Sequence, residues 1–213
     1  SRLMAATPYE ILTFVGRGET SKGPVQIDGR FNWPDDVMTG AMNLKGENLL
    51  VADTPEYKVI ASPNLTLRAG GEGYDVEGEI LVPTAKISPK DLSTSVSTSP
   101  DERVIDLEVE DAEPAKPQRI RSRVRVALGD NVRVESFGLK ARLGGEVVVM
   151  TEPGDVARGL GAINVLEGEY KAFGQDVKIT KGTLKYDHTP LGEPQIELTA
   201  ERTIKDQDIT VAV

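Results

Sequence analysis

The sequence lacks cysteine altogether, and this absence excludes disulfide frameworks, thiolate metal sites and cysteine nucleophiles. It contains one histidine, His188, so metal sites built from several histidines are excluded and a Ser-His-Asp triad is disfavoured. Long hydrophobic runs are also missing, because the longest, Val147–Met150, falls far short of the roughly 18 residues that a membrane-spanning helix needs. The sequence therefore lacks many of the residues that catalytic and metal sites use, and the pattern of its aliphatic residues is more informative.

The sequence also has fewer basic than acidic residues. The chain has 25 Lys and Arg residues against 34 Asp and Glu, which gives a formal net charge of −9. A general nucleic-acid binder needs a basic surface to displace counterions from phosphates, so that class of function is disfavoured. With 213 residues, the chain is long enough for one sizeable domain with a core of its own.

The two ends of the sequence have no features of a complete precursor. The chain starts without Met, carries no signal-peptide pattern, and stops inside an alternating, strand-like segment at residues 209–213. We therefore expect it to be a piece of a longer protein. On that expectation, the absence of a targeting signal carries no information about location.

Apolar and polar residues alternate along most of the chain, with the period of two that is typical of β-strands. Twenty-one glycines and 13 prolines divide these alternating segments from one another. Residues 9–15 could form a short helix, but their β-branched residues favour a strand. The sequence predicts an all-β fold of about 14 antiparallel strands joined by short turns.

Alternation places apolar side chains on one face of a sheet and polar side chains on the other. A closed sandwich or barrel would bury the apolar face on itself, whereas an elongated, curved sheet would leave it as a groove. The aromatic content is 5%, with one tryptophan, which is low for a β-sandwich that relies on large aromatic side chains in its core. The predicted groove lining, for lipid or a client strand, comprises Val124, Val126, Leu128, Val132, Val134, Phe137, Leu139, Ala141, Leu143, Val147, Val149, Ile163, Val165, Val177, Ile179, Leu184, Tyr186, Ile196, Leu198 and Ala200.

The apolar positions of this lining change phase near residue 136. They are even-numbered from Val124 to Val134 and shift to odd numbers at Phe137. Both sets can occupy one face only if a bulge or turn lies near residues 136–138, where Gly138 would relax the backbone.

Residues 83–118 interrupt the alternation with a segment rich in serine, proline and acidic residues. Apart from a possible strand at Val104–Val109, this composition indicates a connector. Both flanks have the same strand character. We therefore predict one continuous sheet with an N-terminal part at residues 1–83, an insertion at 84–118 and a C-terminal part at 119–213.

Charge is unevenly distributed around this insertion. Residues 101–113 contain seven acidic residues and a single arginine, and Arg119, Arg121, Arg123 and Arg125 follow shortly afterwards. Alternate arginines in a strand form a row on one face. The row is consistent with an ordinary solvated outer face, or with a docking stripe for the acidic loop, a partner or lipid phosphates.

Motifs that would indicate an enzyme have simpler explanations here. The GGEG sequence at residues 70–73 is a single copy and predicts a turn rather than a tandem calcium-binding repeat. Gly16-Arg17-Gly18 is not followed by a helix pattern or a Lys-Ser/Thr pair, so it does not predict a phosphate-binding loop. His188 lies in a turn-like sequence, and no Gly-x-Ser-x-Gly elbow is present. We expect no enzymatic activity, no cofactor and no metal.

Several longer motifs resemble the TamB C-terminal domain family. They include LGDNVRVESFGLKARL at residues 128–143, INVLEGEY at 163–170, FGQD at 173–176, KGTL at 181–184 and EPQIELTAER at 193–202. Upstream, ILVPTAKI at residues 80–87 and SPD at 99–101 are similar to the segment that precedes a variable linker in the family. The resemblance covers roughly residues 25–213. One departure is Tyr186-Asp187-His188, which replaces the family's commoner aromatic-Ser/Thr-Gly-Pro turn.

The resemblance implies a fold and a setting. The family's fold is a "β-taco", a long sheet folded lengthwise around an apolar groove. Its members belong to the translocation and assembly module of Gram-negative bacteria, are anchored in the inner membrane and work in the periplasm beside the outer-membrane barrel TamA. Two functions are implied: conducting phospholipids between the membranes, or acting as a chaperone for outer-membrane proteins such as autotransporters. The sequence alone does not separate them.

Overall fold

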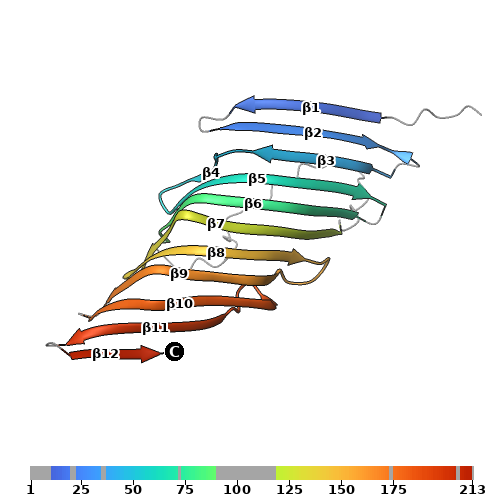
Figure 1. Ribbon diagram of the computed structural model, residues 1–213. Coiled ribbons are helices and arrows are strands. Elements are labelled where there is room, and N and C mark those ends of the chain that lie inside the picture. The colour runs from blue at the N-terminus through green and yellow to red at the C-terminus, as the bar shows by residue number, and fades with distance from the viewer. Residues whose placement is uncertain are drawn as a thin grey trace, which may run out of the picture.

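The computed structural model describes residues 11–19, 23–34, 37–71, 73–89, 119–172, 175–204 and 207–212. These residues form twelve strands of a single sheet (Figure 1). In chain order the strands are β1 (Ile11–Glu19), β2 (Pro24–Asn32), β3 (Thr39–Gly46), β4 (Leu49–Asp53), β5 (Tyr57–Gly70), β6 (Gly73–Ile87), β7 (Ile120–Ser136), β8 (Leu139–Thr151), β9 (Arg158–Ala172), β10 (Gln175–Pro190), β11 (Gln195–Ile204) and β12 (Gln207–Ala212). The all-β prediction is confirmed.

Strand order follows chain order almost throughout. From one end of the sheet to the other the order is β1-β2-β3-β5-β6-β7-β8-β9-β10-β11-β12, and β4 pairs with β5 beside β3. Figure 1 shows the result as one open, curled layer, with β1 at one end and β12 at the other. Such an up-and-down arrangement follows from short connections, since successive strands joined by tight turns pair with each other.

One pair of strands departs from the predicted antiparallel pattern. β6 and β7 lie side by side in parallel, with Tyr74 opposite Ile120 and Ile87 opposite Val134. The two flanks of the interrupted segment therefore belong to one sheet, and β6 continues to Ile87, beyond the boundary predicted at residue 83. Residues 90–118, which include the possible strand at 104–109 and the acidic stretch, lie outside the described residues.

In the described part of the chain there are twelve strands, against about 14 predicted for the whole sequence, and some turn-like sequences lie inside them. Gly129 and Asp130 sit in an irregularity of β7, where the register with β8 shifts between Leu128 and Val132. His188 lies in β10 rather than in a turn, at a bulge between Asp187 and Thr189, and has a positive φ of 57°. A bulge accommodates one extra residue without ending the strand. Residues 11–15 of the segment considered for a helix belong to β1.

Register shifts recur in neighbouring strands and form a line across the sheet. They occur at Leu50/Ala52 of β4, Val82/Thr84 of β6, Leu128/Val132 of β7 and Ile179/Lys181 of β10. β9 shifts as well, opposite Arg142 of β8. Because each bulge bends its strand and increases the local twist, aligned bulges curve the sheet as a whole.

Two glycines in β8 and β9 adopt backbone conformations in which a side chain would clash with the neighbouring strand. Gly145 has a φ of +108°, and a Cβ added there would lie 2.4 Å from the carbonyl oxygen of Ala162. Gly161 has a φ of +131°, and its added Cβ would lie 2.4 Å from the carbonyl oxygen of Glu146. Neither position tolerates a side chain, so the backbone geometry here depends on glycine.

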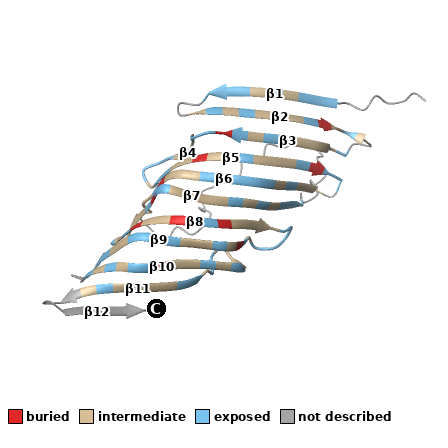
Figure 2. Cartoon of the chain, viewed as in Figure 1, coloured by how far each residue is buried: buried red, intermediate tan, exposed pale blue. Residues whose placement is uncertain are grey.

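The buried hydrophobic residues all belong to one face of the sheet. Within the described chain these are Phe31, Ala61, Ala69, Ala85, Val132, Ala141 and Val147. Figure 2 shows the buried residues of the chain as separate short segments in different strands rather than as a closed interior. No large side chain among the described residues is fully buried, as expected for a single layer. The core of this molecule is therefore one side of a sheet.

Candidate functional site: the apolar face

Hydrogen-bonding register determines which residues share a face of the sheet. Directly opposed residues of neighbouring strands point the same way, and residues two apart in a strand do too. Val126 lies opposite Val147, and Val132 lies opposite Leu143. We call the face that carries these four residues the apolar face, and the opposite one the polar face.

The apolar face continues from β8 through β11. Leu143 lies opposite Val165, which lies opposite Gly182, which in turn lies opposite Leu198. The same reasoning, carried along each strand and across each bulge, places all the predicted lining residues on the apolar face except Phe137. The structure thus brings together side chains that are up to 76 positions apart in sequence, from Val124 to Ala200.

Phe137 lies in the turn between β7 and β8 and is 53% exposed. The turn has two residues, Phe137 with a φ of 49° and Gly138 with a φ of 85°, and Ser136 pairs directly with Leu139. Positive φ at both central positions is the geometry that suits the twist of a hairpin. The predicted turn at residues 136–138 is confirmed, and it explains the change of phase that places Val132 and Leu139 on one face.

The apolar face extends beyond the predicted lining into the N-terminal half of the sheet. Ile80 lies opposite Val126 across the parallel pair, and Pro63 of β5 lies opposite Ile80. Further on, Leu65 lies opposite Leu44 of β3. The alternation in β5 and β6 and the continuity of the sheet across the insertion were predicted from the sequence, but the parallel pairing of β6 with β7 was not. Without that pairing, the two halves of the face could not be joined.

Exposure varies widely over the apolar face. Val132 is only 2% exposed, whereas Ile196, near the start of β11, is 60% exposed. Most of the lining residues between them are partly exposed. In the part of the chain that the structure describes, every strand belongs to the one sheet, so no second layer packs on this face. Its side chains shield one another and remain partly accessible.

The polar face carries charge pairs, and the most regular set lies along the parallel pair. Three acidic residues of β6 lie directly opposite three arginines of β7, and the opposed pairs are Asp75 with Arg121, Glu77 with Arg123, and Glu79 with Arg125. Opposite charges at directly opposed positions stabilise one register of a strand pair over its alternatives. Among the described residues, the Glu79–Arg125 rung of this charge ladder forms an ion pair, whereas Glu77 pairs with Arg68 of β5. The opposed charges still favour the observed register of β6 with β7.

The arginine row of β7 forms ion pairs within the sheet itself. Arg125 contacts both Glu79, at 3.3 Å, and Glu146, and its hydrogen bond with Glu146 is the leading cause of its raised pKa. Arg121 pairs with Glu152 at 3.2 Å. These contacts agree with the interpretation of the row as a solvated outer face.

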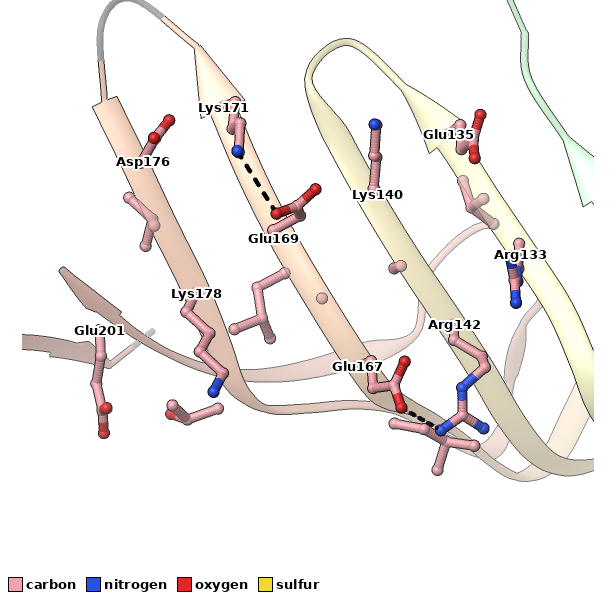
Figure 3. A pocket seen from close by; sticks show the side chains of 17 residues that line it. Arg133, Glu135, Lys140, Arg142, Glu167, Glu169, Lys171, Asp176, Lys178 and Glu201 are labelled. Atoms are coloured by element: carbon pink, nitrogen blue, oxygen red, sulfur yellow. Dashed lines mark hydrogen bonds and ion pairs between the residues drawn. The ribbon is translucent and has the colours of Figure 1, made fainter.

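The polar face also has a shallow depression of about 970 Å³ over β7 to β11 (Figure 3). Arg142 and Glu167 form an ion pair there at 2.7 Å, and this hydrogen bond lowers the pKa of Glu167. Lys171 and Glu169 form a second pair at 3.7 Å. The charged residues that line the depression are basic and acidic in equal number, and they are Arg133, Glu135, Lys140, Arg142, Glu167, Glu169, Lys171, Asp176, Lys178 and Glu201.

The Arg142–Glu167 pair links β8 to β9, whereas Lys171 and Glu169 both belong to β9. The balanced charge of the depression favours no ion of either sign. Within the described ranges, no cluster of three or more potential metal ligands was found. Among these residues there is also no helix of the length and hydropathy needed to cross a membrane.

The chain is similar to a known protein family and to a curated protein. The family model described as the TamB C-terminal domain matches residues 15–213. The translocation and assembly module subunit TamB of Haemophilus influenzae is similar to the chain at 29% identity over 216 residues. That alignment includes 94% of the chain but only 16% of the relative, so the chain corresponds to a small part of the relative's length.

Proposed function

The chain belongs to the TamB C-terminal domain family, and from this premise we propose that its apolar face conducts the acyl chains of phospholipids between the inner and outer membranes. In this proposal the chain is a periplasmic segment of a subunit of the translocation and assembly module. That subunit is anchored in the inner membrane, and its partner at the outer membrane is TamA. The transfer needs no cofactor and no enzymatic step.

One observation carries the proposal: the apolar face is continuous across the sheet and uncovered in the described structure. An acyl chain lying on it gains roughly 0.8 kcal/mol for each CH₂ group removed from water. The face is mainly aliphatic, and its polar groups are few. Such a lining suits movement along the face better than tight binding in one orientation. Curvature from the aligned bulges would enclose a bound chain further, as in a groove.

A second candidate function is assembly of outer-membrane proteins such as autotransporters. It is supported by the two strands at the ends of the sheet, because β1 and β12 each have a single hydrogen-bonded neighbour in the described structure. An unpaired strand edge can add a strand from a client through backbone hydrogen bonds. In that case the apolar face would receive the client's apolar side chains.

Photo-crosslinking in cells tests the choice between these two functions. A photoreactive residue is placed singly on the apolar face and, as a matched control, at the adjacent position on the polar face. Adjacent positions differ only in the direction of the side chain. The pairs of positions, apolar face first, are Val126 and Arg125, Leu139 and Lys140, and Leu198 and Glu197.

Lipid transfer predicts that phospholipid is captured from the apolar positions and much less from their controls. Capture of client or TamA segments at the apolar positions, with lipid no greater than in the controls, would favour assembly instead. Equal lipid labelling on both faces would overturn the transfer proposal for this chain.

A further inference from the structure

One charged residue, Arg202 in β11, lies on the apolar face. Ala200 belongs to this face because it lies opposite Ile179, whereas Glu201 lies opposite Lys178 on the polar face. Because successive side chains of a strand point to opposite faces, Arg202 lies on the apolar face. Outside the bulges, it is the one charged residue on this face among the strand residues whose side chains the structure describes.

Arg202 is partly buried and has no ion pair with any described residue. On the polar face, Arg121, Arg125 and Arg142 each pair with a carboxylate. Other arginines of that face without an ion pair to a described residue, such as Arg123 and Arg133, are exposed to water, unlike Arg202. A guanidinium held against an apolar surface without a counter-charge is costly, because it loses part of its hydration and gains no partner. Its position therefore suits a ligand that brings both apolar surface and negative charge.

The residues beside Arg202 mark the rim of the apolar face. Lys178 of β10 lies opposite Glu201 of β11, so the next residues along the antiparallel pair, Val177 and Arg202, are neighbours. Val177 in turn lies opposite Tyr170 of β9. Tyr170 is 37% exposed, near the end of β9, and lies two strands from Arg202, at about 10 Å between backbones. A tyrosine with an apolar ring and a free hydroxyl is typical of the boundary between an apolar region and water.

From this arrangement we propose that Arg202, assisted by the hydroxyl of Tyr170, binds the phosphate of a phospholipid whose acyl chain lies on the adjoining apolar face. This inference rests on the proposed function and adds a headgroup site to it. The guanidinium presents planar paired donors to two phosphate oxygens, which a lysine ammonium cannot do. The acyl chain would then extend along the aliphatic residues, with the headgroup at the rim in contact with water.

Binding of two single-chain lipids to the purified chain tests the site. The probes are lysophosphatidylglycerol and monoacylglycerol with the same 14-carbon chain, so they differ in the phosphate-containing headgroup but not in the acyl chain. Arg202→Gln is compared with Lys178→Gln, which removes the same charge one row away on the polar face. Lys178, like Arg202, has no ion pair with a described residue. Circular dichroism confirms that each variant keeps its strands.

We expect Arg202→Gln to weaken lysophosphatidylglycerol binding about tenfold, the effect of losing one charge-assisted hydrogen bond, and to leave monoacylglycerol binding unchanged. Lys178→Gln should change neither. Arg202→Lys should restore part of the affinity, and Tyr170→Phe should cause a smaller loss than Arg202→Gln.

Equal weakening of both probes by Arg202→Gln would overturn the phosphate site, because it would indicate a packing role. An equal effect of Lys178→Gln would overturn it too, by showing general electrostatics. If Arg202→Gln leaves both affinities unchanged, the headgroup site is wrong while acyl binding stands. If neither probe binds the unaltered chain, the proposed function itself fails.

Discussion

The two faces of this sheet use the same backbone for different purposes. On the polar face, charges are matched strand by strand, as in the ladder between β6 and β7 and in the pair of Arg142 with Glu167. On the apolar face, the side chains form no specific pairs and only shield one another from water. Val132 is therefore 2% exposed although no second layer of the described structure covers it. One face therefore specifies which strands pair and in which register, and the other provides continuous apolar surface.

Placing a charge at the most protected apolar position should produce the largest effect. Val132→Asp puts a carboxylate at a position with almost no access to water, and no described basic side chain on that face is close to it in register. We expect it to lower the free energy of unfolding by about 3–5 kcal/mol. Urea denaturation followed by circular dichroism measures this loss.

The neighbouring substitution Arg133→Asp is the control, since Arg133 is exposed on the polar face. Its cost should be about 1 kcal/mol or less. Equal losses from the two substitutions would contradict the division into an apolar and a polar face.

Charging a partly exposed apolar position should affect function more than stability. In Leu143→Arg the long side chain can lie along the open face and reach water with its guanidinium, so the loss of stability should be only about 1–2 kcal/mol. Lipid captured by a photoreactive residue at Val165, directly opposite in β9, should nevertheless fall to background. Global unfolding of this variant would instead indicate a closed, covered core.

Removing one rung of the charge ladder should have a smaller effect. A double-mutant cycle with Glu79→Gln and Arg125→Gln isolates the interaction across the parallel pair. We expect a small favourable coupling that decreases further in concentrated salt, because both side chains are about half exposed. A coupling of zero in low salt would show that the ladder does not contribute to the register.

Lowering the pH should have the most gradual effect. Hydrogen bonds from Arg142 and Lys185 lower the pKa of Glu167 and Glu197, respectively, below the ordinary value of 4.5. A carboxylate with a lowered pKa in the folded state stabilises that state above pH 4.5, and this contribution is lost as the pH falls through the folded pKa. Thermal melting between about pH 6 and pH 3 should show a decline below pH 4.5 that is shallower in Glu167→Gln and Glu197→Gln.

The sequence predicted the apolar face well because alternation determines the direction of each side chain. Residues as far apart as Val124 and Ala200 were assigned to one surface, and their register places them there. Phe137 was misplaced because an apolar residue in a hairpin turn continues the alternating pattern by coincidence.

Strand number and direction were harder to predict. Gly129-Asp130 and the segment around His188 have turn-forming residues, yet bulges accommodate them inside long strands. The direction of β7 relative to β6 leaves no trace in a period of two, because parallel and antiparallel strands alternate alike. The charges of the ladder do not reveal it either, because Asp75, Glu77 and Glu79 would face Arg125, Arg123 and Arg121 equally well in an antiparallel pair.

The parallel alignment of β6 with β7 also has a consequence for how the chain folds. Ser136 and Leu139 meet across a turn of two residues, and such hairpins close rapidly. Tyr74 and Ile120 are 46 positions apart in sequence, so they can pair only after two distant parts of the chain have been brought together. The strands β1–β6 and β7–β12 are therefore expected to assemble as two separate meanders, and the joining of β6 to β7 is expected to be the slow, final step of folding.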